Sequence, residues 1–236
     1  MQMIDFENNP AATPVLDIHR YVEDFAASVV PAYRRGVADE ELGADVGVAR
    51  SLIPPGTSAT RDFSALAPKI PDFLREKCVG CMLCISACPD TAILAVALPE
   101  ADVAERTAAF VAADPAPELA KPSVDSHFSH TQKYAVVPER QGKAPASFGI
   151  FVDPVHCKGC SECVEVCDAA GHHALVMIDK VADEGAGEST LDRYQRDMRF
   201  FRTLPPTPAE YRNEKALVDL MLGEHAIGYV GGAGSC

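Results

Sequence analysis

The sequence predicts an α+β fold, organised as a pseudo-twofold module of short antiparallel strands and helices, with helical and irregular extensions at both ends. A cysteine-rich run occurs twice, as CVGCMLCISACPD at 78–90 and CKGCSECVEVCDA at 157–169. Each run is followed by a short apolar stretch typical of a buried strand, AILAV at 92–96 and ALVMI at 174–178. Such an internal repeat indicates two equivalent halves, separated here by an insertion at 97–147.

The first 65 residues are predicted to form an N-terminal helix and a wrapping loop. Thr13 suits the capping position of the helix, and Pro14 suits its first turn. Pro31 is expected to end or kink the helix. Residues 40–65 are rich in glycine and proline and are expected to form the loop. The helix has an apolar face at three- and four-residue spacing, made of Val15, Ile18, Val22, Phe25 and Val29.

Residues 66–182 are predicted to be the repeated domain, and 183–236 a connector. In the insertion we expect a helix over about 101–113, followed by irregular chain. FGIFVDP at 148–154 alternates as a strand does. In the connector, 191–208 is expected to be a helix that ends in a proline-rich stretch. A second helix is expected over 210–222, with Gly223 as its stop.

The composition excludes several classes of protein. With 34 acidic against 21 basic residues the formal net charge is −13, which argues against nucleic-acid partners, because phosphate contacts need lysine and arginine. No stretch is as long and apolar as a membrane helix, and the start, MQMIDFENNP, lacks the features of a secretory signal. We therefore expect a cytoplasmic protein, whose nine cysteines serve as ligands and not as disulfides.

The spacing of the cysteines indicates iron–sulfur clusters. Structural zinc sites use pairs of C-x2-C, whereas each run here has a triplet at two-residue gaps and a fourth cysteine after a gap of three. A disulfide scaffold needs an oxidising compartment. Zinc and disulfides remain the alternatives to two 4Fe–4S clusters.

The fourth cysteine of each run is expected to serve the other cluster. In ferredoxins with two clusters, the last cysteine of the C-x2-C-x2-C-x3-C-P run ligates the cluster of the other run. Applied to this chain, the rule predicts that each half supplies one ligand to the cluster of the other half. No residue is expected to be catalytic. Cluster I would take Cys78, Cys81, Cys84 and Cys167, and cluster II would take Cys157, Cys160, Cys163 and Cys88.

Residues around the cysteines are expected to tune the clusters. Gly80 and Gly159 let backbone N–H groups point at sulfur. Pro89 follows the first run, whereas Asp168 follows the second. A carboxylate beside Cys167 opposes the addition of an electron, so our hypothesis is that Asp168 lowers the potential of cluster I; a solvated carboxylate with no effect is the alternative. Apolar cover is expected from Val79, Met82, Leu83, Ile85, Val164 and Val166.

The surroundings of the runs resemble one enzyme family. LIPPGTSATRDFSALAPKIPDFLREKCVGCMLC at 52–84 resembles the lead-in to the ferredoxin domain of pyruvate:ferredoxin oxidoreductase and its 2-oxoacid relatives. FGIFVDPVHCKGCSECVEVC and ALVM resemble the second half of that domain. The final GGAGSC resembles the start of the thiamine-diphosphate domain, where Cys236 would match a ligand of a third 4Fe–4S cluster. The resemblance covers about residues 50–236, departs from the family at Asp168, and suggests a fragment of a longer enzyme.

The resemblance implies an electron-transfer role. In such enzymes a 2-oxoacid, most often pyruvate, reacts on thiamine diphosphate, and electrons leave through clusters to an external ferredoxin or flavodoxin. This chain would be the outer part of that route. Thiamine diphosphate, Mg and the third cluster would lie elsewhere in the full enzyme, which is expected to be a homo-oligomer whose thiamine-binding part is a partner of this segment. The alternatives are a free-standing or accessory two-cluster ferredoxin, and a ferredoxin-like subunit of a hydrogenase or an NADH dehydrogenase.

Overall fold

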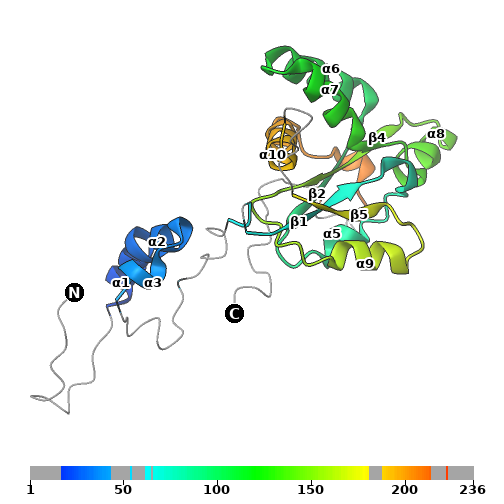
Figure 1. Cartoon of the computed structure of the whole chain (residues 1–236). Coiled ribbons are helices and arrows are strands. Elements are labelled where there is room, and N and C mark those ends of the chain that lie inside the picture. Colours follow the sequence, from blue (N-terminus) through cyan, green and yellow to red (C-terminus); the bar gives the residue numbers. More distant parts are fainter. Residues whose placement is uncertain are drawn as a thin grey trace, which may run out of the picture. The chain divides into compact units, whose positions relative to one another are not determined.

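The computed structural model describes residues 17–43, 54, 62–64, 66–180, 188–213 and 222. It divides the chain into two compact units, Met1–Arg61 and Asp62–Cys236. The first unit contains the helices drawn in blue in Figure 1, and the second contains all the strands of the described chain. The combination of helices with small antiparallel sheets confirms the predicted α+β class.

The first unit is a short helical segment. Its described part, residues 17–43, contains α1 (Ile18–Asp24), a π-helical turn η1 (Phe25–Val29), α2 (Val30–Arg35) and α3 (Ala38–Glu41). The helix begins after Asp17, so the predicted start at Thr13 is wrong. The Asp17 carboxylate accepts the backbone N–H groups of His19 and Arg20 at 3.1 and 3.3 Å, and this satisfies the free donors of the first turn. Thr13 and Pro14 lie outside the described residues.

Pro31 does not end this helix. The π-helical turn η1 comes directly before it, and Pro31 lies in the first turn of α2, where its missing N–H costs no hydrogen bond. The helix continues to Arg35 and stops at Gly36, which adopts a left-handed conformation with φ of 72°.

The second unit is built on two small antiparallel sheets. One pairs β1 (Lys69–Phe73) with β5 (Leu175–Asp179), and the other has the order β2 (Ile93–Pro99), β4 (Ala146–Val152), β3 (Phe128–Ser129). The strand that enters the first cysteine run therefore pairs with the strand that leaves the second. The strand that leaves the first run pairs with the one that enters the second. This exchange brings the two runs together, although Cys78 and Cys157 are 79 positions apart in the sequence.

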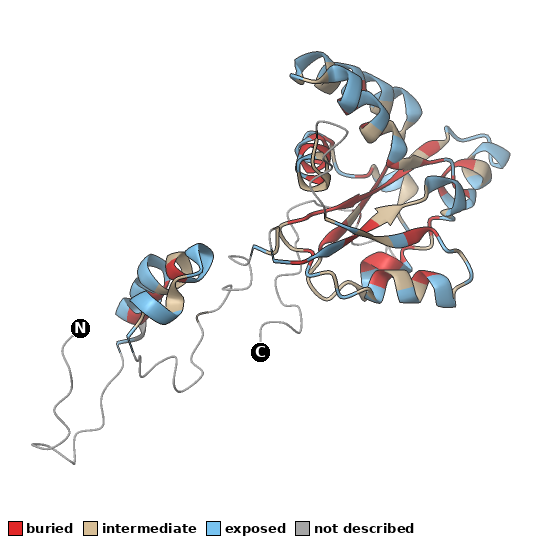
Figure 2. Cartoon of the chain, viewed as in Figure 1, coloured by how far each residue is buried: buried red, intermediate tan, exposed pale blue. Residues whose placement is uncertain are grey.

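The β2–β4 sheet separates two apolar cores. Along β2, Ile93 and Ala95 face one core, whereas Val96 and Leu98 face the other. The first core also contains cysteines of both runs and two short helices, α5 (Leu83–Ala87) and α9 (Glu162–Ala169), which lie together on one side of the strands in Figure 1. The second core packs β2 and β4 against helices on the other side. The buried strands between the two cores stand out in Figure 2.

The insertion is folded, so the irregular chain expected after its first helix is wrong. The predicted helix is α6 (Glu100–Ala113), and after it come α7 (Pro117–Ser126), β3, a π-helical turn η4 (Gln132–Val136) and α8 (Val137–Arg140). Two prolines of this stretch, Pro117 and Pro138, lie in the first turns of helices, whereas Pro122 lies inside α7. Tyr134 is buried and stacks on Phe148 of β4, with ring centroids 4.8 Å apart.

A buried polar network anchors the insertion to the sheet. His127, just after α7, points one ring nitrogen at the carbonyl of Ile150 (2.8 Å) and the other at the carboxylate of Asp197 (2.9 Å). Ser123 donates to the same carboxylate at 2.7 Å. The His127 ring also stacks on Phe151, with centroids 4.4 Å apart. The network ties α7 to β4 and to the helix that follows the repeat.

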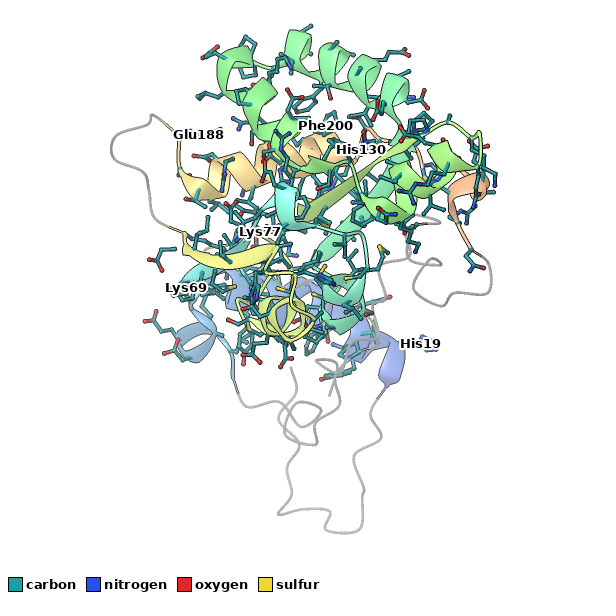
Figure 3. The ribbon with its side chains drawn as sticks, turned by 90° about the vertical axis from the view of Figure 1, so that its right-hand side faces the viewer. His19, Lys69, Lys77, His130, Glu188 and Phe200 are labelled. Atoms are coloured by element: carbon teal, nitrogen blue, oxygen red, sulfur yellow. The ribbon has the colours of Figure 1, made fainter. Side chains whose placement is uncertain are left out.

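That helix is α10 (Thr190–Phe201), and it confirms the helix predicted over 191–208. It is strongly amphipathic and buries Met198, Phe200 and Phe201 in the second core; Phe200 is labelled in Figure 3. Beyond it the chain forms a 3-10 turn, η5 (Ala209–Tyr211), and 212–213 are not helical, so the helix predicted from residue 210 is wrong there. Most of its remainder lies outside the described residues.

Candidate metal centre

The two cysteine runs fold into matching loops. Gly80 and Gly159 have left-handed backbone conformations, with φ of 75° and 72°. Met82 and Ser161, each next to the second cysteine of its run, are left-handed as well, with φ of 68° and 70°. Each loop leads into a short helix, α5 or α9, and the two helices pack against each other. The repeat seen in the sequence is therefore a repeat of backbone geometry.

The two glycines are packed so closely that a larger side chain would collide. A Cβ atom on Gly80 would lie 3.1 Å from the Thr131 hydroxyl and the Tyr134 ring, which belong to the insertion. A Cβ atom on Gly159 would lie 2.8 Å from the backbone carbonyl oxygen of Lys69. Lys69, labelled in Figure 3, begins β1. Thus the insertion covers one loop, and the chain before the first run covers the other.

Four thiols, three from the first run and one from the second, line one hollow, which we call site I. Most of its other lining is apolar and includes Phe73, Leu83 and Leu175. His172 also borders the hollow. The four thiols of site I belong to Cys78, Cys81, Cys84 and Cys167.

The complementary four thiols line a second hollow, site II. Both hollows have a volume of about 340 Å³, including the part open to solvent. The lining of site II is more polar than that of site I and contains Asp90, His156, Lys158 and Glu162. The four thiols of site II belong to Cys88, Cys157, Cys160 and Cys163.

Backbone N–H groups point at sulfur in both sites, and they do so in matched pairs. Ala92 donates to the Cys88 sulfur and Ala174 to the Cys167 sulfur, each at 3.2 Å. The N–H of Gly80 points at Cys78, and that of Gly159 points at Cys157. Such bonds favour negatively charged sulfur and stabilise a reduced cluster.

Burial disfavours the ionised, thiolate form of these cysteines when no metal is bound. It raises the pKa of Cys78 to about 11 and that of Cys163 to about 12, and neighbouring cysteines add to both shifts. Burial also raises the pKa of Cys84, and here Cys167 of the other run contributes. Because thiolates are the metal-binding form, several buried thiols are stable as ligands only where metal charge replaces their protons. The donor set therefore fits a metal-bearing group that takes up four thiolates.

Four thiols around each hollow are compatible with a polynuclear group. Across the residues that the structure describes, no group of three or more His, Cys, Asp or Glu side chains is arranged to hold one metal ion. The eight cysteines of the two sites are all free thiols. A tetrahedral zinc ion needs four sulfurs at about 2.3 Å from one point. The ligands of a 4Fe–4S cluster each bind a different iron and lie farther apart, around a hollow such as site I or site II.

The structure shows what the difference between Pro89 and Asp168 does to the backbone. Cys88 precedes a proline and is extended, with ψ of 112°, so α5 ends at Ala87. No proline follows Cys167, and α9 continues to Ala169. The second copy therefore has a longer helix before its chain returns to the sulfur.

Asp168 lies at the surface, with 46% of its side chain exposed, and its carboxylate is 2.8 Å from the His173 ring. The N–H that Cys167 accepts comes from Ala174 and not from Asp168. Water and His173 therefore screen the charge that we expected to act on cluster I.

Two lysines lie near site II that the sequence did not indicate. Lys158 pairs with Asp90, with 2.9 Å between the ammonium and the carboxylate. Lys180, at the end of β5, donates to the backbone carbonyls of Phe63 (3.1 Å) and Ser64 (3.4 Å) and interacts electrostatically with Cys157. No local pattern could have revealed Lys180, because its partners come more than 100 positions earlier in the chain.

The remaining predicted residues are placed as follows. His156, beside Cys157, is paired with Asp153 at 3.2 Å. Its pKa is raised because Asp153 accepts a hydrogen bond from it, while burial acts in the opposite sense. Cys236, the predicted ligand of a third cluster, lies outside the described residues.

In the described part of the chain, no helix has the length and apolar character needed to cross a membrane.

Comparisons with known proteins agree with the iron–sulfur interpretation. The family of 4Fe-4S binding domains matches residues 71–94, which contain the first cysteine run. The pyruvate-flavodoxin oxidoreductase of Klebsiella pneumoniae is 26% identical over 159 residues, which make up 67% of this chain and 11% of that protein. A probable pyruvate-flavodoxin oxidoreductase of Escherichia coli K12 is 30% identical over 151 residues, or 62% of this chain and 10% of that protein.

The chain thus spans about a tenth of the length of these curated relatives. It contains a segment that matches 4Fe-4S binding domains, and it is similar over part of its length to pyruvate-flavodoxin oxidoreductases, as the resemblance implied.

Proposed function

We propose that the chain is the electron-transfer segment of a 2-oxoacid:ferredoxin oxidoreductase. It would carry electrons from the thiamine site of the whole enzyme to an external ferredoxin or flavodoxin, and pyruvate is the 2-oxoacid that we favour. The observation that supports this most is the exchange of the fourth cysteine. Cys167 lies with the thiols of the first run, and Cys88 lies with those of the second.

Each residue then has a defined role. Site I would hold one 4Fe–4S cluster and site II another, and each cluster accepts and releases one electron at a time. The backbone N–H groups of Ala92 and Ala174 stabilise negative charge on the sulfurs that cross between the runs. No residue of the chain is proposed to act on substrate. The chain would transfer electrons and would not make or break covalent bonds of the substrate.

The domain boundaries follow from the same proposal. Residues 66–182 would form the two-cluster module, with 97–147 as its insertion, and 1–65 and 183–236 would be extensions. Thiamine diphosphate, Mg and a third cluster, with Cys236 as one ligand, would belong to the full, homo-oligomeric enzyme. The cytoplasm is the proposed location, because the eight thiols of the two sites are free and reducing conditions keep them so.

The first test is electron delivery. The chain is reconstituted with iron and sulfide under anaerobic conditions, reduced with dithionite, freed of excess reductant and mixed with oxidised flavodoxin. We expect the flavodoxin to be reduced as the iron–sulfur absorbance of the chain returns. The Cys88→Ala/Cys167→Ala double variant is the matched control and should reduce little flavodoxin. A reconstituted chain that takes up no electrons from dithionite would contradict the proposal.

The second test distinguishes the enzyme from a free-standing ferredoxin. The native protein that carries this sequence is purified from its own cells and assayed for reduction of flavodoxin that depends on pyruvate and coenzyme A. We expect activity and bound thiamine diphosphate. A native species of only 25.2 kDa, the mass of this chain, without thiamine diphosphate would favour the free-standing ferredoxin instead.

A further inference from the structure

Most features that set the potential of a cluster are the same in the two sites. Each has four thiols, a left-handed glycine and a backbone N–H donated to its crossing cysteine at 3.2 Å. Features that are the same in both sites shift the two reduction potentials by equal amounts and leave the difference between them unchanged. A difference between the sites must therefore come from groups that the repeat does not share.

Charged side chains are the main group that is not shared. Among the described residues that line site I, His172 is the only titratable side chain apart from the four thiols. Asp168, next to Cys167, is at the surface, where water and His173 screen it. The described lining of site I is therefore mainly apolar and contains no lysine or arginine.

Site II has several charges, but most of them are compensated. Lys158 acts on Cys88 and Cys160, and its partner Asp90 lies 2.9 Å away in the same lining. His156 is likewise paired with Asp153. Glu162 is exposed to solvent, which screens its charge.

Among the residues that the structure describes, Lys180 is the cation near site II with the least opposing charge. It is half-buried, and its ammonium donates to two neutral carbonyl groups, those of Phe63 and Ser64. Phe63 in turn donates its N–H to the carbonyl of Val155 at 2.8 Å, two residues before Cys157, so the Lys180 ammonium lies close to the loop of site II. Of the described carboxylates, Asp62 acts on Lys180 in return. A positive charge in a partly dehydrated position favours added negative charge nearby, so Lys180 stabilises the reduced form of whatever site II binds.

We propose that Lys180 makes site II the preferred location of an electron shared by the two sites. The inference rests on the proposed function, since it requires a cluster in each site. Cys160 of site II is the one exposed thiol among the eight. A redox partner that docks beside Cys160 therefore meets the site where the electron resides.

The test measures how one electron is distributed between the sites. The reconstituted chain is poised with one electron per molecule, and the paramagnetically shifted cysteine β-proton signals are assigned to site I or site II by NMR. We expect site II to be the more reduced in the natural chain. Lys180→Gln should lower the ratio of site II to site I reduction about tenfold, which equals about 59 mV for a one-electron couple.

Three further variants separate charge from structure. Lys180→Arg keeps the charge and should retain the natural ratio. Lys69→Gln, the matched control, removes an exposed lysine paired with Asp179 and should leave the ratio unchanged. Asp62→Asn frees Lys180 of its opposing carboxylate and should move the electron further toward site II. It also serves as the deciding variant should Lys180→Gln fail to hold iron.

The possible results are distinct. An unchanged ratio in Lys180→Gln, an equal loss in Lys180→Arg, or no shift toward site II in Asp62→Asn would overturn the role of Lys180 and leave the proposed function intact. A natural chain that reconstitutes with fewer than about eight irons would overturn both, because two 4Fe–4S clusters could not then be present.

Discussion

Site I and site II share their ligand geometry but differ in what covers them. The folded insertion covers the loop of site I with Tyr134, whereas the chain at Lys69, with Lys180 nearby, covers the loop of site II. Site I is consequently lined mainly by apolar groups, and site II by polar and charged groups. The repeated sequence thus determines the thiols of both sites, and the unrepeated segments determine how the surroundings of the two sites differ.

The largest effects are expected from the cysteines that cross between the runs. Removing Cys167 should empty site I, although Cys167 belongs to the second run, and removing Cys88 should empty site II. We expect Cys167→Ala and Cys88→Ala each to lose about half of the iron, because a 4Fe–4S cluster needs four ligands. The NMR signals of the remaining cysteines identify which site has been lost. Loss of site II in Cys167→Ala would show that each run serves its own cluster and that the crossing is wrong.

The next largest effect is expected from loosening the insertion, which packs on the Gly80 loop of site I. Asp197→Ala removes the carboxylate that His127 and Ser123 bind in the buried network. Breaking a buried pair of this kind should destabilise the chain by about 3 kcal/mol, measured by chemical denaturation under anaerobic conditions. Because the network anchors the insertion, iron of site I should become accessible to a chelator before iron of site II.

The matched control for Asp197→Ala lies on the surface of α7, the helix whose Ser123 binds the Asp197 carboxylate. Asp125→Ala removes an exposed carboxylate paired with Lys121 and should cost at most about 1 kcal/mol. Equal destabilisation by the two variants, or equal loss of iron from both sites in Asp197→Ala, would contradict the role assigned to the insertion.

Alanine at the two loop glycines should produce a smaller and graded effect. Gly80, Gly142 and Gly159 all have φ near +70°, where alanine costs about 1–2 kcal/mol. Gly142 has open space around its Cβ position and so reports the backbone strain alone. Gly80→Ala must also displace side chains of the insertion, and Gly159→Ala must displace the backbone of Lys69.

Thermal loss of the iron–sulfur absorbance measures this series. We expect the midpoint temperature to fall least for Gly142→Ala, more for Gly80→Ala and most for Gly159→Ala, because a backbone carbonyl yields less easily than a side chain. A larger drop for Gly80→Ala than for Gly159→Ala would mean that the cover of site I is the more rigid of the two.

The smallest effect is expected from Asp168. Its exposed carboxylate lies beside Cys167, so Asp168→Asn should raise the potential of the cluster in site I only slightly. We expect at most about a threefold change in the distribution of one electron, because solvent screens exposed charges. Redox titration monitored by EPR provides the measurement. A change as large as that expected for Lys180→Gln would show that Asp168, and not Lys180, dominates the difference between the sites.

The sequence predicted the repeated part of the molecule well, because repetition and period-two patterns are local signals. The strands at 92–96, 148–154 and 174–178 and the helix near 101–113 were recognised from the chain alone. The fold of the insertion after α6 was missed, because Pro117 and Pro138 suggested irregular chain but begin helices that tertiary packing stabilises.

The charges around the candidate sites were equally beyond local reasoning. Lys180 follows β5, and its partners Phe63 and Ser64 precede β1, so only the antiparallel pairing of these two strands brings them together. The pairing of Lys158 with Asp90 depends on the contact between the two halves of the repeat. The difference between the sites therefore became visible only in three dimensions.

The central claim is that eight cysteines from two runs hold two 4Fe–4S clusters. Determination of iron and acid-labile sulfide in the anaerobically reconstituted chain tests it most directly. We predict about eight irons and about eight sulfides per chain. A chain that binds zinc in place of iron, or that saturates at about four irons, would contradict the account.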